Sequence, residues 1–496
     1  MKNILYNISV FRDTIAELIN PAKQLHDAHF AGNGKLKGLF GNVLDNETGL
    51  LLGRDRFGHV LSVRPTKSRR ELGNILIEAP TRGGKGLLAT SQLLTWPHSV
   101  IVNDIKGDLF SQTAGYRNGF SDVIVVDPTG VGNGYDPLEG KNSEDELFSS
   151  AAQLLFKADE GDGAIFTQRA TVMLTQLFLA AREEGEAPFP YVRHMVRSGL
   201  TNAVDRLEAV SPELATQFLD VEFSQANLSD RFLLSAWGTL SARIRPLLTE
   251  TVIRSLASSH FSAGQLMRGE KPVTVYLRWP ERDLLALSPL VRLIWGSLID
   301  ELITTYDRAG GQNCHPVLLL IDEAGRSAIP SLADHATTVV GRGISLWIAV
   351  QSLSQLEAVY GRTRARTLRD NMESQVYYRP SDQETADYLE RCLGRRSGFA
   401  SSQTTGEGSY SSQSLSEQAV PLMTAQAIKQ MGDEEIIGFH RRLPPFEAKR
   451  MDWRDFPELQ RRRGIPPPKL QPLPELEPIG WRKHTNTTYF DPDLVH

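Results

Sequence analysis

A segment of nine residues that starts at Glu78 has the composition of a phosphate-binding loop. It reads Glu-Ala-Pro-Thr-Arg-Gly-Gly-Lys-Gly and lies between the apolar run 75–77 and a segment of helical pattern. At such a strand-to-helix junction, glycines let backbone N–H groups face the phosphates of a nucleotide, and a lysine reaches the β and γ oxygens. We therefore expect nucleotide to contact the loop residues Thr81, Arg82, Gly83, Gly84, Lys85, Gly86 and Leu87.

The loop departs from the pattern G-x-x-x-x-G-K-[ST] at both ends. Ala79 replaces the first glycine, and Gly86 replaces the hydroxyl residue that ligates magnesium. The loop therefore keeps its glycine cradle and its cation and lacks one metal ligand. As a bare pattern it has an alternative interpretation, an ordinary glycine turn that leads into a helix.

The acidic pair Asp322-Glu323 follows the apolar run 317–321 and is the second candidate for chemistry. In nucleoside triphosphatases, one carboxylate of such a pair is held near Mg²⁺ and the next orients or deprotonates the attacking water. We expect Asp322 to hold the metal, mostly through water, and Glu323 to be the catalytic base. Taken alone, the pair could equally be a strand end followed by a helix-capping aspartate.

Two more polar residues flank the apolar run 344–350. Gln351 follows the run and is a candidate sensor of the γ-phosphate or of the attacking water, with a strand cap as the alternative. Arg342 stands between two glycines before the run. It is either a surface arginine or a finger that reaches the site of a neighbouring subunit, and its position alone favours the surface arginine.

Short apolar runs separated by helical patterns must position these residues. They predict the buried parallel strands of a doubly wound α/β sheet. The runs are 74–77, 99–103, 123–126, 273–277, 317–321, 346–350, 375–378 and 435–438. Residues 141–265 show amphipathic runs at 144–157, 168–183 and 232–256 without a strand pattern, which predicts an inserted all-α domain.

The remaining segments complete the predicted organisation. Residues 71–140 and 266–456 form the nucleotide-binding motor, and a mixed leader at 1–70 packs on it. Residues 397–416, rich in Ser, Gly, Gln and Thr, are expected to be a flexible loop. The Pro-rich tail 457–496 is expected to be an extended strap or linker, and the arginines at 461–463 are interpreted as solvated surface charge.

Composition bounds the class of protein. The 496 residues suggest two or three domains, and 54 basic against 59 acidic residues give a net charge of -5. Nucleic acid would therefore have to bind a local basic surface. Cys314 and Cys392 are too few for a disulfide framework and are expected to be buried. No segment approaches the roughly 18 apolar residues of a membrane span, so we expect a cytoplasmic location without a transmembrane segment.

Further motifs follow the loop in a fixed order along the chain. They are Asp-Ile-Lys-Gly-Asp-Leu at 104–109, Val-Val-Asp-Pro at 125–128, the run 322–326, the run 351–361, Asp-Gln-Glu-Thr-Ala at 382–386 and Val-Pro-Leu-Met at 420–423. With the loop, they resemble the motor domain of type IV secretion coupling proteins of the TraG/TraD kind. The resemblance covers about residues 27–456. A loop that ends in lysine and glycine is a form that this family often shows.

The resemblance implies a RecA-like P-loop NTPase fold that carries an all-α domain and binds ATP and Mg²⁺. It also implies a homo-hexamer with nucleotide sites at subunit boundaries, which makes Arg342 the best candidate for an arginine finger. Such a motor feeds DNA, or a relaxase or other secretion substrate, into a type IV secretion channel. It would contact the DNA largely without regard to sequence.

Members of this family usually carry N-terminal membrane helices, and this chain starts without them. We therefore expect a separate membrane anchor or a secretion component to recruit it, with a peripheral position at the inner face of the cell membrane. Two alternatives stay open: a nucleotide-binding adaptor that docks substrates without hydrolysis, and a soluble DNA translocase of the segregation or repair kind. A small-molecule kinase is the least favoured interpretation.

Overall fold

The computed structural model describes residues 27–41, 47–67, 69–156, 163–220, 230–326, 329, 332–405 and 411–476. The chain divides into two units. One comprises Met1–Trp96 and Trp347–Pro457, and the other comprises Pro97–Leu346 and Glu458–His496. The predicted motor ranges, 71–140 and 266–456, are thus divided between the two units.

The first unit is built on a mixed sheet with the strand order β2-β1-β14-β13-β10-β3-β9. The strands are β1 (Leu50–Arg54), β2 (Val60–Val63), β3 (Ile75–Glu78), β10 (Ser374–Tyr378), β13 (Glu435–His440), β14 (Phe446–Lys449) and, from Trp347 onward, β9 (Ile344–Val350). β3 pairs in parallel with β9 and β10. The other pairs are antiparallel.

Strand β13 corrects one prediction, because the run 435–438 was expected to be parallel and pairs antiparallel with β10. β13 and β14 form a hairpin, and this hairpin continues the sheet with antiparallel pairs. An apolar run reports burial on both faces of a sheet but carries no information about strand direction.

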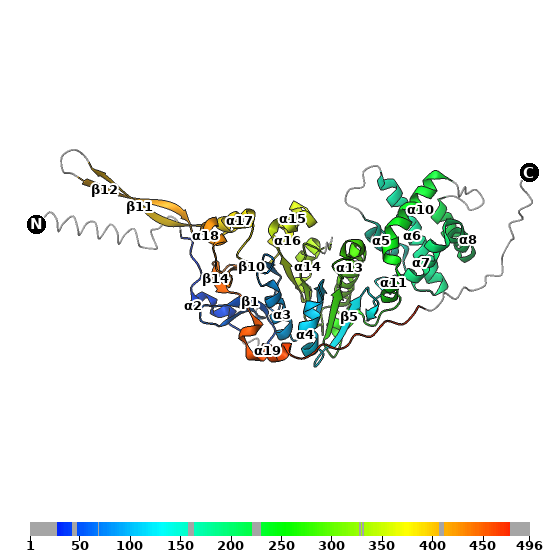
Figure 1. Cartoon of the computed structure of the whole chain (residues 1–496), viewed down its shortest axis with the longest axis horizontal. Helices are drawn as coiled ribbons and strands as arrows, with labels where there is room; N and C mark the ends of the chain where they lie inside the picture. Colours follow the sequence, from blue (N-terminus) through cyan, green and yellow to red (C-terminus); the bar gives the residue numbers. More distant parts are fainter. Residues whose placement is uncertain are drawn as a thin grey trace, which may run out of the picture. The chain divides into compact units, whose positions relative to one another are not determined.

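Strands β11 (Arg395–Thr405) and β12 (Ser411–Pro421) form a separate antiparallel ribbon, which projects as the long two-stranded arm in Figure 1. The prediction of a flexible loop at 397–416 is therefore wrong for residues 397–405 and 411–416, and residues 406–410 lie outside the described ranges. A hairpin ribbon satisfies the backbone groups of each strand with those of the other, so a polar composition does not prevent it. The helices of this unit are α2 (Asn33–Leu36), η2 (Lys37–Leu39), α3 (Lys85–Thr95), α15 (Leu353–Tyr360), α16 (Arg362–Asp370), α17 (Gln383–Leu393), α18 (Ala425–Lys429) and η8 (Trp453–Asp455).

The second unit contains a sheet with the strand order β8-β4-β7-β5-β6. The strands are β4 (Ser99–Asp104), β5 (Asp122–Asp127), β6 (Val131–Gly132), β7 (Val273–Arg278) and β8 (Val317–Ile321). The first four in this order are parallel, and β6 is an antiparallel edge. Every residue of β4 and β8 is buried, as the apolar sequence of β8 predicts, and in β4 this includes the polar residues Ser99, Asn103 and Asp104.

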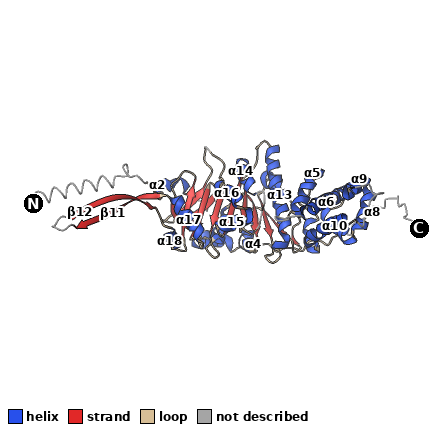
Figure 2. Ribbon diagram, turned by 90° about the horizontal axis from the view of Figure 1, so that it is seen from above, coloured by secondary structure: helices blue, strands red, loops and turns tan. Residues whose placement is uncertain are grey.

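Between β6 and β7 the described residues form helices and no strand, and Figure 2 shows these helices packed together. They are α5 (Glu144–Leu155), α6 (Ala164–Glu184), α7 (Pro188–Ser198), α8 (Leu200–Val210), α9 (Pro212–Leu219), α10 (Arg231–Ile244), η6 (Arg245–Leu248), α11 (Glu250–Leu256) and α12 (Ala263–Arg268). α5 begins at a capping box of Ser143 and Glu146. The apolar face of α6 is buried among these helices, which accounts for the amphipathic pattern.

The second unit also contains α13 (Leu284–Arg308), α14 (Leu332–Thr338), η7 (Val340–Arg342) and most of α19 (Pro457–Arg463). No helix in the described ranges is both long and apolar enough to cross a lipid bilayer. Cys392 is exposed and Cys314 is half-buried, so the predicted burial of both cysteines is wrong.

The start of the tail packs on α4 (Asp108–Arg117). The Arg462 guanidinium lies 4.8 Å from the ring centre of Tyr116, and its Nε donates to Glu458 at 3.0 Å. The carbonyl oxygen of Ile465 approaches Gly115 so closely that an added Cβ would lie 2.1 Å from it. Arg462 is therefore buried, which corrects its interpretation as solvated charge, and its partner Tyr116 is too distant in sequence to be foreseen.

Replacing Gly115 with alanine should loosen this packing, because the new methyl group has no room beneath Ile465. We expect the free energy of unfolding to fall by about 1–3 kcal/mol, the usual cost of overpacking, and trypsin to cleave faster at 461–463. Gly238→Ala in α10 is the control, since no described atom lies within 4 Å of its added Cβ. Equal denaturation midpoints and cleavage rates for the two variants would contradict the close approach.

Candidate nucleotide-binding site

The loop from Ala79 to Gly84 joins β3 to α3 and is held at its base. The amide of Ala79 donates to Val350 O at 3.0 Å, and the amide of Gly83 donates to Pro80 O at 2.8 Å. Arg82 and Gly84 have left-handed backbones, with φ of 65° and 109°. Gly84 adopts this conformation readily because it has no Cβ.

Helix α3 begins directly behind the loop, with Lys85 as its first residue. Gly86 and Leu87 follow in the first turn, where the amide of Leu87 bonds to Gly84 O at 3.0 Å. The N-terminus of a helix attracts anions because its first N–H groups have no partner within the helix. The predicted loop residues thus form one glycine-bent segment with a lysine at a helix start.

Arg450 also lies against the loop, and no sequence motif marks it. Its Nη1 donates to Gly83 O at 3.4 Å and to Asp433 O at 3.2 Å. A Cβ added at Gly84 would lie 3.1 Å from this nitrogen. Arg450 therefore adds a second cation to the loop, and a side chain at Gly84 would contact it tightly.

Gln351 lies beside the loop, as its place after β9 suggests. Thr81 Oγ1 donates to Gln351 Oε1 at 3.2 Å, and the backbone N–H of Gln351 donates to Gln355 Oε1 at 3.3 Å. β3 and β9 are parallel neighbours, with Glu78 opposite Val350. Residues that follow the two carboxyl ends therefore meet, and the structure brings the candidate sensor into contact with the loop.

Glu78 ends β3 beneath the loop and is completely buried. Neither of its carboxyl oxygens has a hydrogen-bond partner among the described residues. Burial, followed by the nearby charge of Asp382, raises the pKa of Glu78 well above its ordinary value of 4.5. Folding thus favours the neutral acid, and the sequence had marked this residue only as the start of the loop.

The acidic pair lies in the second unit, at the carboxyl end of β8. Asn103, at 0% exposure, donates through Nδ2 to Asp322 O at 3.2 Å. Its Oδ1 accepts the indole N–H groups of Trp279 and Trp295 at 3.2 and 3.3 Å. This buried amide ties the backbone of Asp322 to the neighbouring strand β4 and to the core behind it.

Glu323 is 5% exposed and has a left-handed backbone, with φ of 61°. Such a φ is uncommon for a residue other than glycine and costs energy. Lys106 Nζ lies 3.4 Å from Glu323 Oε1, and Arg326 Nε lies 3.5 Å from Oε2. Arg326 also pairs with Glu281. The candidate base thus lies between two cations. Both belong to motifs noted in the sequence, 104–109 and 322–326, for which no role of the cation was predicted.

Arg342 ends η7 and forms a two-pronged ion pair within its own unit. Its Nε and Nη2 donate to the carboxylate of Asp307 at 2.8 and 3.0 Å, and Nη1 donates to Thr338 O at 3.2 Å. The hydrogen bonds to Arg342 lower the pKa of Asp307. An arginine finger would have to exchange this partner for a phosphate.

The donor set around Asp322 fits magnesium only if the nucleotide and water contribute. In the part of the chain that the structure describes, no three His, Cys, Asp or Glu side chains cluster as metal ligands. Mg²⁺ usually takes one or two carboxylates and fills its shell with water and phosphate oxygens. Asp322 is sufficient on these terms, and Gly86 provides no metal donor from the loop.

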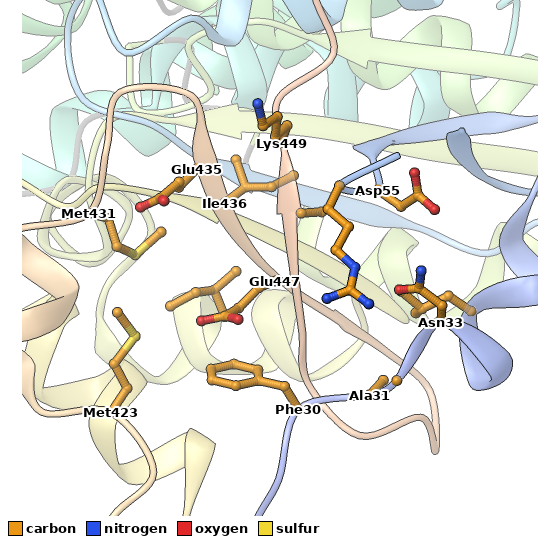
Figure 3. A pocket seen from close by; sticks show the side chains of 15 residues that line it. Phe30, Ala31, Asn33, Asp55, Met423, Met431, Glu435, Ile436, Glu447 and Lys449 are labelled. Atoms are coloured by element: carbon orange, nitrogen blue, oxygen red, sulfur yellow. The ribbon is translucent and has the colours of Figure 1, made fainter. Parts of the chain in front are cut away.

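A pocket of about 420 Å³ lies elsewhere in the first unit, between the segment 30–36 and strands β13 and β14 (Figure 3). Met423, Met431 and Ile436 line it, together with the carboxyl groups of Glu435 and Glu447. Burial, and then the charge of Glu435, raises the pKa of Glu447. None of the predicted site residues lines this pocket, so it is separate from the phosphate loop.

The glycine-bent loop between β3 and α3, with Lys85 at the helix start, places the chain among α/β proteins with a loop of the P-loop type. Residues 57–469 match the family model described as Type IV secretory system Conjugative DNA transfer. The chain belongs to this family.

Two curated relatives illustrate the similarity. The conjugal transfer protein TraG of Escherichia coli is 27% identical over 391 residues, which are 72% of this chain and 60% of TraG. Protein VirD4 of Rhizobium radiobacter is 24% identical over 439 residues, which are 83% of this chain and 61% of VirD4. The chain thus spans about three fifths of the length of these relatives.

A solved structure confirms the predicted fold class. The bacterial conjugative coupling protein TrwBdeltaN70, in complex with sulphate, superposes with a TM-score of 0.59 at 18% identity. The match covers 76% of this chain and 85% of that chain. The fold is therefore the RecA-like P-loop type, with a mainly parallel sheet and inserted helices.

Replacing Glu78 with glutamine should change how stability depends on pH. Between pH 4.5 and the raised pKa, the folded protein binds more protons than the unfolded chain, so wild-type stability falls as pH rises. Glu78→Gln lacks this proton, so its stability relative to wild type should increase with pH through that window. Urea denaturation at several pH values measures the difference, and Glu434→Gln, at an exposed position, is the control for the lost charge. A difference for Glu78→Gln that is constant with pH would contradict the raised pKa.

Proposed function

We propose that this chain is an ATP-driven DNA translocase that couples DNA, or a protein linked to DNA, to a type IV secretion channel. The observation that carries the proposal is the contact of Gln351 with Thr81 on a glycine-bent loop, in a chain of the conjugative DNA transfer family. Solved structures of TrwB are described as complexes with an ATP analogue and with ADP and Mg²⁺. These support ATP and Mg²⁺ as the ligands of this chain.

Each site residue has a proposed role in hydrolysis. The loop residues Thr81 to Leu87, with the Lys85 ammonium, bind the phosphates, and Asp322 holds the metal. When bound, Mg²⁺ would neutralise charge on the phosphate oxygens. Glu323 orients the attacking water and accepts its proton on a carboxylate oxygen, while Gln351 holds the same water or the γ-phosphate.

Arg342 acts across a subunit boundary in this proposal. Its guanidinium leaves Asp307 and places its fork of N–H donors on the γ-phosphate of a neighbouring subunit, where negative charge develops. The active assembly is then a homo-hexamer. Half-exposed arginines can exchange partners in this way because a surface ion pair contributes little stability.

The cargo is DNA, contacted mainly through its phosphates, or a relaxase or other secretion substrate bound to DNA. We propose that type IV secretion components or a separate membrane anchor hold the motor at the inner face of the cell membrane. The names of TraG and TrwB, a conjugal transfer protein and a conjugative coupling protein, support DNA as the cargo. A docking adaptor without turnover is the alternative, and measurements of ATP hydrolysis separate the two.

Lys85→Ala and Glu323→Gln should each abolish ATP hydrolysis stimulated by DNA. Loss of the base alone should lower the rate at least about 100-fold. Nucleotide binding should weaken in Lys85→Ala and persist in Glu323→Gln, because glutamine keeps the shape of the side chain. Phosphate release and binding of a fluorescent ATP analogue measure the two effects, with the exposed Lys429→Ala as control. A rate of phosphate release by Glu323→Gln equal to that of the wild type would contradict the proposed mechanism.

Arg342→Ala should bind ATP normally and hydrolyse it about a thousandfold more slowly, the usual effect of a missing finger. Mixing it with Glu323→Gln should restore part of the rate, because some boundaries then pair an intact Glu323 with an intact Arg342. Asp307→Asn removes only the partner within the chain and should not lower the rate. Loss of ATP binding in Arg342→Ala, or a mixture no faster than its components, points to a local role instead.

A further inference from the structure

We propose that Lys106 is a latch that holds Glu323 until a phosphate of the DNA backbone draws the lysine away. This inference rests on the proposed function, and it assigns a role to a residue outside the predicted phosphate loop and acidic pair. It makes the candidate base available when DNA is present.

Each carboxylate oxygen of Glu323 lies near one cation: Lys106 Nζ is 3.4 Å from Oε1, and Arg326 Nε is 3.5 Å from Oε2. An attacking water that bonds to Oε1 of this nearly buried carboxylate has to compete with Lys106 for that oxygen. The strained backbone at Glu323 indicates that the surrounding structure fixes its position. The Glu323 side chain is 5% exposed, whereas those of Lys106 and Arg326 are 51% and 38% exposed, so the cations move more easily than the carboxylate.

Lys106 is the cation more easily released. It is attached by a flexible stem, its side chain is 51% exposed, and its distance of 3.4 Å to Glu323 is long for a charged hydrogen bond. Arg326 is restrained by a second ion pair, to Glu281. An anion that approaches from solvent will therefore compete for Lys106 first.

A cavity of about 390 Å³ adjoins Lys106 at the carboxyl ends of β4, β5 and β7. The charged groups that line it are Lys106, Asp127, Arg278 and Glu281. Arg278 pairs with Asp127 at 3.2 Å, and Glu281 pairs with Arg326. The partner of Lys106, Glu323, does not line the cavity. A phosphate that enters can thus bind the lysine without breaking an ion pair between two lining residues.

The exchange of partners links DNA binding to hydrolysis in both directions. If a phosphate pulls Lys106 from Glu323, then loss of the Glu323 charge must strengthen DNA binding by the same factor. An ion pair that is half exposed is worth about two- to fivefold in an equilibrium. Both sides of this linkage can be measured.

Lys106→Ala should hydrolyse ATP about two- to fivefold faster than wild type without DNA, and DNA should stimulate it correspondingly less. Lys271→Ala is the matched control, because Lys271 is 50% exposed and pairs with Asp122 at 2.7 Å in the same unit. It should behave as wild type. A lower rate of hydrolysis in Lys106→Ala would show that the lysine assists Glu323. An unchanged rate would show that the lysine has no effect on Glu323. Either result overturns the latch.

DNA binding tests the latch without hydrolysis. Glu323→Gln should bind a fluorescent single-stranded oligonucleotide about two- to fivefold more tightly than wild type, and adding Lys106→Ala should remove that gain. Lys106→Ala should also reduce the slope of log affinity against log salt by about 0.7, the value for one phosphate contact on a single strand. Additive effects of the two substitutions, or no DNA binding by the wild type, overturn the latch. Wild-type protein that shows this coupling but does not hydrolyse ATP contradicts the proposed function and leaves the latch in place.

Discussion

A phosphate-binding loop must direct backbone N–H groups toward the bound phosphates. The conformation of the loop between β3 and α3 depends on this requirement. Gly84 meets it with a left-handed backbone that a larger residue would strain, and Arg450 lies close to where a Cβ would stand. The base of the loop is tied to β9 through Ala79, so the loss of the usual first glycine does not open the turn. Because β9 is parallel to β3, the same pairing delivers Gln351 to Thr81.

Charged partners hold the two candidate catalytic groups of the second unit. Glu323 forms ion pairs with Lys106 and Arg326, and Arg342 forms an ion pair with Asp307. Both groups must leave their present partners before they can act in hydrolysis. This requirement keeps the rate of ATP hydrolysis low until other conditions are met. We propose that DNA releases the base and that a neighbouring subunit receives the arginine. Hydrolysis then requires nucleotide, cargo and assembly together.

The sequence predicted the parts of this molecule that depend on local pattern. The fully apolar run 317–321 became the buried parallel strand β8, and the position of Gln351 after such a run was enough to place it near the loop. Features set by distant partners could not be predicted. Arg450 meets Gly83 across 367 positions, and the apolar run of β13 gave no sign of its antiparallel direction. The β11–β12 ribbon was missed because its polar composition is also typical of loops.

The central claim is that this chain turns over ATP in response to DNA. The most direct test is the rate of phosphate release by the wild-type protein at increasing concentrations of single- and double-stranded DNA, with its oligomeric state measured in the same samples. We expect a low rate without DNA and a saturable increase with it, accompanied by assembly to a hexamer. Tight ATP binding with no phosphate release under any of these conditions would contradict the claim and identify the chain as a nucleotide-binding adaptor.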